Sequence, residues 1–303
     1  MAQNKKTKKK QKSIIPRLSF GLVTCAVLFM VGVGSFLLPI HASKKTIQDS
    51  PKTEMKRVPQ QFKKVLAETT IQSTVRIPIL MYHYVEYIKD TKDKTRALLN
   101  IQPHIFDEQV KTLKAAGYTF LTARDVGLIL DGQKMLPDKP IVLTFDDGHW
   151  DLDTDVLPIL KKYNVSATAY IVPGLLGGSD YLTDGQLRDV IGSGLVEIAA
   201  HTINHVSLKG LALTMVKHEV EGSKEMLEKT YHVSVVSFAY PNGSFDETAG
   251  KIVKEAGFSN SVSTIPGIMQ SHENLYFLYR LRPGGRTGEE LLHFLSQETF
   301  KPW

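Results

Sequence analysis

The chain has 303 residues, a formal charge of +6 and 42% hydrophobic residues, so a folded core is expected and disorder throughout is excluded. The charge is uneven, because residues 1–74 hold 14 Lys/Arg against 3 Asp/Glu, whereas residues 75–303 hold 23 against 28. A nucleic-acid-binding protein carries its positive patch on the folded domain, so this distribution argues against a nucleic-acid partner.

The N-terminus combines a lysine-rich stretch with an uncharged apolar run. Lysines dominate residues 5–12, and no charged residue lies between Leu18 and Ile40. About 20 apolar residues cross a bilayer as a helix, and a Lys/Arg-rich flank stays in the cytoplasm. We therefore expect a basic cytoplasmic tail over 1–17, a transmembrane anchor or signal segment over 18–40 that contacts the lipid bilayer, and a polar linker over 41–74. The alternative is a cleaved signal peptide, which would leave a secreted protein.

Residues 75–303 read as one alternating α/β domain. Strands are expected at 77–84, 118–121, 141–145, 167–172, 195–200 and 235–240, and helices at 106–116, 156–163, 184–193, 213–231 and 247–256. This order predicts a mostly parallel sheet, open or closed into a barrel. In such folds the chemistry collects where strands end, so the residues after each strand carry the functional prediction.

Two motifs follow predicted strands. The strand expected at 141–145 is followed by Asp146-Asp147-Gly148, and the strand expected at 195–200 is followed by His201-Thr202-Ile203-Asn204-His205. Two histidines four apart on a helical turn point the same way and bind one metal ion. Taken singly, the first motif also fits a surface turn and the second fits two unrelated surface histidines.

The two motifs complete one another. One carboxylate and two histidines form a facial metal site with open positions for water and substrate. The helical zinc protease motif has Glu after its first His as the base, whereas this chain has Thr202 there. The second carboxylate of the aspartate pair supplies the missing base, so the pair of motifs predicts a metal-dependent hydrolase.

The strings Thr144–Gly148 and His201–His205 resemble the first two motifs of the polysaccharide deacetylase family, the family-four carbohydrate esterases. The intervening segments 157–163 and 167–169 are also similar to that family. The resemblance implies a distorted (β/α) barrel that binds one divalent metal ion, commonly zinc. It also implies that the metal ligands are Asp147, His201 and His205, and that the general base is Asp146.

A third motif departs from the family's best-known pattern. Many members have Arg two residues before a Pro-Tyr pair, but Ala239 stands there in Phe238-Ala239-Tyr240-Pro241-Asn242-Gly243. This form, with the earlier string Ile79–His83, resembles the branch that contains poly-N-acetylglucosamine deacetylases of bacterial biofilms. The missing Arg would orient the catalytic Asp, and Arg280 and Arg282 are the candidates to replace it.

The resemblance also implies a donor to the reaction oxyanion and a general acid. Pro241 has no N–H, so the backbone N–H of Asn242 is the nearest donor, and it matches the family's donor position. Candidate oxyanion or substrate-binding residues are Tyr240, Asn242, His83 and Arg280. The family uses a late histidine as acid, and the late histidines here are His272 and His293, with His83 and His149 as alternative neighbours of the site.

The predicted activity is removal of N-acetyl groups from a cell-surface polysaccharide built of N-acetylglucosamine units. The catalytic domain would lie outside the cytoplasm on a single-pass anchor in the cell membrane. The alternatives are de-esterification of an O-acetylated polysaccharide such as xylan, deacetylation of peptidoglycan, and a non-catalytic sugar-binding module. The complete set of aspartates and histidines argues against the last.

Overall fold

The computed structural model describes residues 74–88 and 92–302. The expected tail, apolar segment and nearly all of the linker lie outside the described residues. Within the described ranges, no helix combines the length and the apolar character that crossing a membrane requires.

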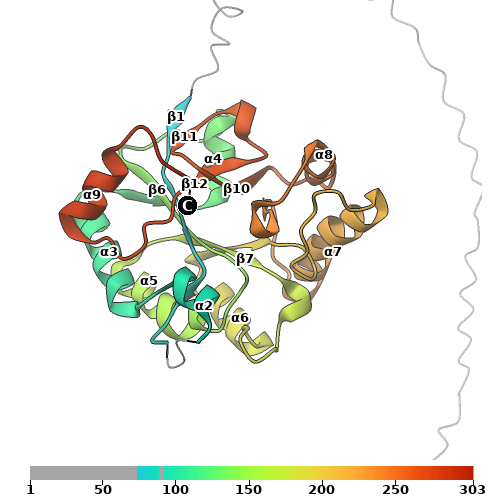
Figure 1. Cartoon of the computed structure of the whole chain (residues 1–303), viewed down its shortest axis with the longest axis horizontal. Helices are drawn as coiled ribbons and strands as arrows, with labels where there is room; N and C mark the ends of the chain where they lie inside the picture. Colours follow the sequence, from blue (N-terminus) through green and yellow to red (C-terminus); the bar gives the residue numbers. More distant parts are fainter. Residues whose placement is uncertain (1–73, 89–91, 303) are drawn as a thin grey trace, which may run out of the picture. The chain divides into compact units, whose positions relative to one another are not determined.

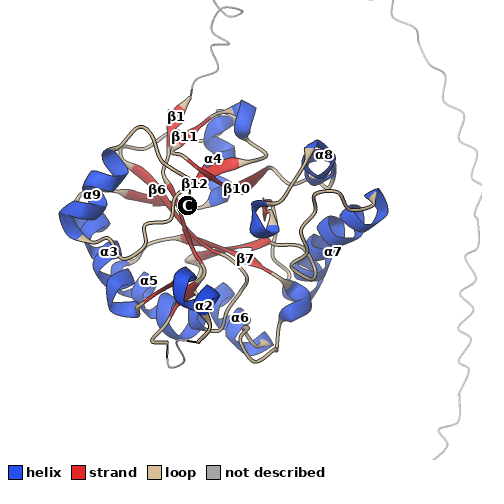
Figure 2. Ribbon diagram, in the orientation of Figure 1, coloured by secondary structure: helices blue, strands red, loops and turns tan. Residues whose placement is uncertain are grey.

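The strands occur largely where apolar runs predict them, and helices surround them (Figures 1 and 2). The strands are β1 (Val75–Arg76), β2 (Ile79–Tyr82), β3 (Tyr84–Val85), β4 (Asn100–Ile101), β5 (Thr119–Leu121), β6 (Pro140–Phe145), β7 (Ala167–Ile171), β8 (Val196–Ala200), β9 (Ser237–Ala239), β10 (Asn260–Pro266), β11 (Met269–Gln270) and β12 (Leu278–Arg280). The α-helices are α2 (Lys94–Leu99), α3 (Pro103–Ala115), α4 (Ala123–Leu130), α5 (Leu157–Tyr163), α6 (Asp184–Gly192), α7 (Leu213–Tyr231), α8 (Glu247–Glu255) and α9 (Gly288–Ser296). Single turns of other helix types lie at Leu152–Val156, Pro173–Leu175, Pro241–Gly243 and His272–Asn274.

The main sheet is parallel and nearly closes into a barrel. Its order is β12-β10-β9-β8-β7-β6-β2, and β5 pairs with the first half of β6. The two ends of this sheet meet through Leu281, which donates to the carbonyl oxygen of Ile79 and accepts from the N–H of Met81, each at 2.8 Å. The mostly parallel sheet expected from the alternating pattern is therefore present, and its near closure agrees with the distorted (β/α) barrel that the family resemblance implies.

The period-2 alternation of β6 decides where the first aspartate points. Ile141, Leu143 and Phe145 belong to the apolar layer shared with the helices, whereas Val142 belongs to a second cluster. That second cluster takes one residue from each of β2, β7, β8, β9, β10 and β12, so it fills the inside of the barrel. Asp146 continues the inward series, because alternate residues of a strand face the same side.

Several elements were not expected from the sequence, and α4 and β10 are the two that bear on the barrel. The helix α4 is short and contains Gly127, yet its start carries a Thr122–Asp125 capping box and its apolar side chains join the inner cluster. The strand β10 buries polar residues, which hydropathy alternation does not report. Segment 201–205, expected as a helical turn, is instead an irregular turn in which Thr202 and His205 adopt positive φ angles of 62° and 56°.

Candidate active site

Asp146 and Asp147 diverge directly after β6. Asp146 stays on the inward face and is 3% exposed. Asp147 takes a left-handed backbone conformation with φ 76°, and Gly148 follows with φ 80°. A left-handed pair turns the chain sharply, so adjacent carboxylates reach different partners.

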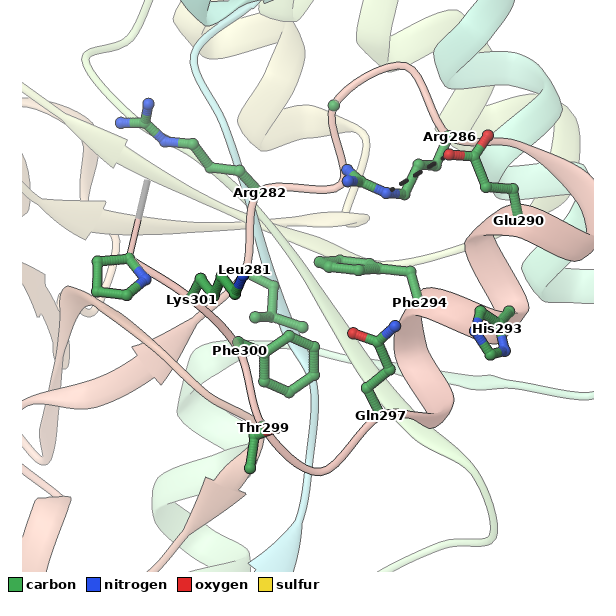
Figure 3. A pocket seen from close by; sticks show the side chains of 12 residues that line it. Leu281, Arg282, Arg286, Glu290, His293, Phe294, Gln297, Thr299, Phe300 and Lys301 are labelled. Atoms are coloured by element: carbon green, nitrogen blue, oxygen red, sulfur yellow. Dashed lines mark ion pairs between the residues drawn. The ribbon is translucent and has the colours of Figure 1, made fainter.

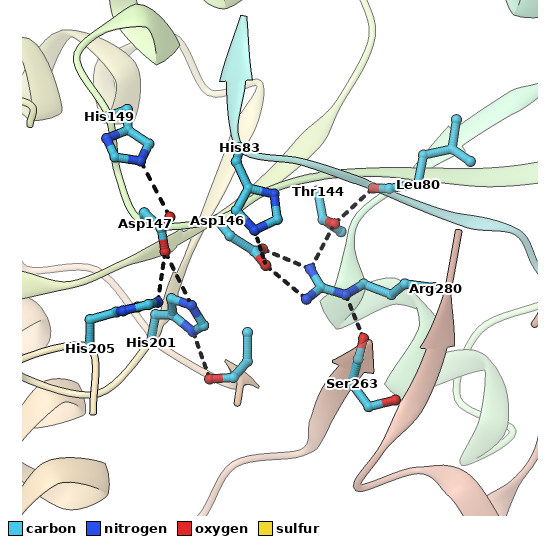
Figure 4. A network of polar contacts seen from close by, with 11 residues as sticks. Leu80, His83, Thr144, Asp146, Asp147, His149, His201, His205, Ser263 and Arg280 are labelled. Atoms are coloured by element: carbon cyan, nitrogen blue, oxygen red, sulfur yellow. Dashed lines mark hydrogen bonds and ion pairs between the residues drawn. The ribbon is translucent and has the colours of Figure 1, made fainter. Parts of the chain in front are cut away.

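Asp147 meets the two histidines of the second motif (Figure 4). Its Oδ1 atom lies 3.4 Å from Nε2 of His201 and 3.1 Å from Nε2 of His205. Ligand atoms of these three residues all lie within 4.8 Å of one another. The irregular turn, with its two left-handed residues, therefore places both histidines beside the same carboxylate oxygen.

The donor chemistry of this cluster fits a cation. Oδ1 of Asp147 is buried and has no hydrogen-bond partner, because neither histidine meets it in hydrogen-bond geometry. Nδ1 of His201 lies 2.8 Å from the carbonyl oxygen of Ala239, so this nitrogen carries the hydrogen and Nε2 presents a lone pair to Oδ1. Converging lone pairs repel unless a positive charge lies between them, and a second ring nitrogen bonded to a carbonyl is typical of metal-binding histidines.

The same side chains also shift the pKa values of Asp147 and His205. Burial alone raises the pKa of Asp147, but the neighbouring His149, His201 and His205 outweigh burial and hold the pKa well below its ordinary value. The contact with Asp147 raises the pKa of His205, against an opposing effect of burial. The carboxylate is therefore ionised at neutral pH, as a metal ligand must be.

Asp146 forms a buried ion pair with Arg280. The guanidinium gives two hydrogen bonds to the carboxylate, at 2.7 and 2.8 Å, and others to Thr144 Oγ1 and the carbonyl oxygen of Ser263 (Figure 4). Burial raises the pKa of Asp146, yet the charge and hydrogen bonds of Arg280 outweigh it and lower the pKa. Arg280, one of the two late arginines, thus pairs with the inward aspartate, and Arg282 lies half-buried at the wall of the same pocket.

Both aspartates open into one cavity of about 350 Å³. Its wall includes most of the residues expected from the sequence, namely His83, Asp146, Asp147, His201, His205, Tyr240, Asn242 and Arg282, together with Thr264. Nε2 of His83 lies 4.0 Å from Oδ2 of Asp146, and burial lowers the pKa of this histidine despite the two carboxylates. The hydroxyl of Tyr240 donates a hydrogen bond to the carbonyl oxygen of Tyr276, so in the described structure this hydroxyl is used within the fold.

The remaining histidine candidates differ in their distance from the aspartate pair. His149 is 3% exposed, and its Nε2 lies 3.3 Å from Oδ2 of Asp147. His272 is exposed and lies 3.8 Å from Asp131. His293 sits on α9 and lines a different cavity of about 740 Å³, which shares only Arg282 with the wall of the first (Figure 3). Neither late histidine therefore reaches the aspartate pair.

The sequence had no signal for Thr264, because it lies on the polar strand β10. His149 was named from the sequence as a neighbour of the site, and its contact with Asp147 agrees with that expectation.

Comparisons with known proteins point to one family. The sequence model of the polysaccharide deacetylases matches residues 133–261. The chain is 29% identical over 238 residues to YxkH of Bacillus subtilis, covering 78% of this chain and 82% of that protein. It is 23% identical over 276 residues to a poly-beta-1,6-N-acetyl-D-glucosamine N-deacetylase of Staphylococcus aureus, covering 86% and 91%.

A solved structure agrees with these matches. The deacetylase PplD of Streptococcus pyogenes, in complex with acetate, superposes with a TM-score of 0.68 at 30% identity. The alignment covers 74% of this chain and 100% of that chain. The similarity therefore extends over most of the described residues.

Proposed function

This chain belongs to the polysaccharide deacetylase family, and from that premise we propose that it removes N-acetyl groups from a cell-surface polysaccharide of N-acetylglucosamine units, with one divalent metal ion, zinc, as cofactor. One observation carries the proposal: a three-ligand cluster and an ionised, arginine-held carboxylate open into the same pocket. The similarity to the staphylococcal enzyme over 86% of the chain supports this substrate class.

The proposed metal ligands are Asp147, His201 and His205. When bound there, the ion supplies polarisation of the acetyl carbonyl and a lowered pKa for water. Asp146 is the base that takes the proton from the attacking water. Its lowered pKa keeps it ionised over the whole neutral range, and Arg280 holds both of its oxygens in place.

Two further residues of the wall have proposed roles in the reaction. The backbone N–H of Asn242, in the turn after β9, is the donor to the oxygen that gains negative charge. His83 is the acid that gives a proton to the departing sugar amine. The pocket wall holds three histidines; His201 and His205 belong to the ligand cluster, and His83 lies beside Asp146 outside that cluster. The reaction then releases acetate and leaves a free amine on the sugar.

The proposed location is the outer face of the cell membrane. The basic residues 1–17 and the uncharged residues 18–40 support a single-pass anchor with residues 75–303 outside. Secretion after cleavage remains the alternative, and both routes place the pocket where a cell-surface polysaccharide is accessible.

Acetate release from two kinds of polymer tests the activity. The zinc-loaded protein is incubated with soluble N-acetylglucosamine oligomers, β-1,6-linked and β-1,4-linked, and separately with acetylated xylan. We expect acetate and an equal amount of free amine from an N-acetylglucosamine oligomer, and a loss of about 10²–10⁴-fold in Asp146→Asn. Acetate from xylan alone would replace the proposal by an esterase, and no acetate from either polymer would reject it.

A further inference from the structure

The turn that carries the two ligand histidines has a conformation that its own residues do not favour. Thr202 and His205 have positive φ angles of 62° and 56°. L-residues rarely adopt this left-handed conformation, and for a β-branched residue such as Thr202 it is an outlier. Such conformations cost free energy and persist only where the surrounding structure fixes them. The shape of the turn must therefore be held by groups outside it.

The carboxyl group of Glu219, on α7, holds the middle of this turn. Its Oε2 atom accepts the backbone N–H groups of Ile203, at 2.9 Å, and of Asn204, at 3.0 Å. Its Oε1 atom accepts from the side-chain amide of Asn204 at 2.8 Å. Glu219 is 2% exposed, so these hydrogen bonds are shielded from water. One oxygen accepts both backbone N–H groups whether or not the other oxygen carries a proton, so the contact does not depend on the charge of Glu219.

Two glycines allow neighbouring segments to approach the same turn closely. Gly174 donates its N–H to the carbonyl oxygen of Ile203 at 2.9 Å, and a Cβ atom at Gly174 would lie 2.5 Å from that oxygen. Gly222 lies three residues after Glu219 and therefore on the same face of α7. A Cβ atom at Gly222 would lie 2.5 Å from Cδ1 of Ile203. The face of α7 that carries Glu219 is thus in direct contact with the turn.

The two histidines depend on the turn to different degrees. His201 directly follows β8, and its backbone N–H donates to the carbonyl oxygen of Ile171 at 3.0 Å. Its ring is also held, because Nδ1 bonds the carbonyl oxygen of Ala239. His205 lies at the far end of the turn from β8, and its side chain is 31% exposed. The 3.1 Å separation between its Nε2 and Oδ1 of Asp147 is therefore set by the shape of the turn.

We propose that Glu219 is a positioning residue that, by accepting two backbone N–H groups of the turn, places His205 where it reaches the same metal ion as the other two proposed ligands. The inference rests on the metal-binding part of the proposed function and is independent of the substrate. Because the turn is already held in the folded protein, little conformational entropy is lost when the ion binds. Groups that fix the orientation of metal ligands from behind typically contribute about 10–100-fold to metal affinity.

Zinc affinity of purified variants tests this role. Glu219→Leu removes both oxygens at a similar size, whereas Glu219→Gln keeps one oxygen for the two backbone N–H groups. In competition with a chromophoric chelator, we expect Glu219→Leu to bind zinc about 10–100-fold more weakly and Glu219→Gln to bind it nearly as tightly as wild type. The matched control is Leu227→Ala, because Leu227 is buried on the same helix but lies about 12 Å further along it. This control should lower the free energy of unfolding and leave zinc affinity unchanged.

Hydrogen exchange in the whole chain, measured with and without zinc, gives a second readout. Without zinc, the N–H groups of Ile203 and Asn204 should exchange slowly in wild type, since both are hydrogen-bonded to a buried acceptor. In Glu219→Leu these two groups should lose protection while those of β8 keep it, and Leu227→Ala should show no such selective loss.

Three results would contradict the proposal. Fast exchange of both N–H groups in zinc-free wild type would mean that the turn is not held, and this result decides the question even if Glu219→Leu does not fold. Wild-type zinc affinity in a folded Glu219→Leu would leave Glu219 a role in stability alone. A loss in Glu219→Gln as large as that in Glu219→Leu would show that accepting the two N–H groups is not what matters.

The outcomes also distinguish this inference from the proposed function. A protein that binds zinc in the expected order of variants but releases no acetate would reject the activity and retain the role of Glu219. Normal acetate release in wild type, with identical zinc affinity in Glu219→Leu, would do the reverse.

Discussion

Replacing Arg280 by methionine removes the charge that keeps Asp146 ionised while filling a similar volume. Arg280 is fully buried, and it gives Asp146 two hydrogen bonds at 2.7 and 2.8 Å. Removing one partner of a buried ion pair destabilises a protein by about 3–5 kcal/mol. Since domains of this kind are stable by about 5–15 kcal/mol, we expect Arg280→Met to remain folded but with a clearly lower free energy of unfolding.

The pH dependence identifies the cause of that loss. In the native protein the pKa of Asp146 is lowered below its unfolded value, so its ionisation adds stability above that value, and the stability is lost as the pH falls through the native pKa. Without Arg280 burial prevails and the native pKa lies above the unfolded value. In that variant the ionised form of Asp146 destabilises the folded state, and the free energy of unfolding falls as the pH rises from the unfolded pKa to the native pKa of Asp146. The stability difference between the two proteins should therefore grow as the pH rises from below the lower to above the higher of the two native pKa values, by about 1.4 kcal/mol in total for each unit that separates them.

Urea unfolding at several pH values measures this difference, and the pH profile of kcat/KM gives an independent reading. A base must be ionised to accept a proton, so the acid limb of the Arg280→Met profile should move to higher pH. The matched control is Arg188→Met, whose pair with Asp184 also has two hydrogen bonds, at 2.9 and 3.3 Å, but is exposed on α6. A stability difference equal at all pH values, with an unmoved acid limb, would refute the idea that Arg280 controls the ionisation of Asp146.

Three other outcomes are expected. Asp146→Asn should keep its metal and lose activity by about 10²–10⁴-fold. Metal analysis should show the ion lost or weakly held after alanine replacement of the proposed ligands Asp147, His201 and His205, and the opposite pattern for the two aspartates would reverse their roles. Residues 75–303 expressed alone should be soluble and should release acetate, since the described strands and helices begin at Val75; failure to fold would mean that the preceding segment is needed. Protease added to intact cells should degrade the part after residue 41, and full protection in cells with a permeable wall would contradict the outward orientation.

Local patterns determined much of the fold. The helix α7 has the bounds 213–231 that its spacing predicts, and β6 begins one residue before its apolar run. The apolar periodicity of such elements recurs within the element itself, so a stretch of sequence no longer than the element is enough to predict it. The strand β10 was not predicted, because its residues Asn260, Ser261 and Ser263 are polar yet fully buried. Their partners, such as the carbonyl oxygen of Tyr276 for Ser261, are known only once the chain has folded.

The site divides in the same way. The sequence by itself determined which residue types form the centre, because Asp146-Asp147 and His201–His205 are short motifs at strand ends. Only the tertiary structure decided that Arg280, which the sequence offered as one of two candidates, pairs with Asp146 across 134 residues of sequence. That contact exists because Arg280 ends β12 inside the nearly closed barrel, whereas Arg282 lies beyond the strand at the pocket wall. Which side of a strand a residue faces is local, but which side chains then meet depends on how the barrel closes.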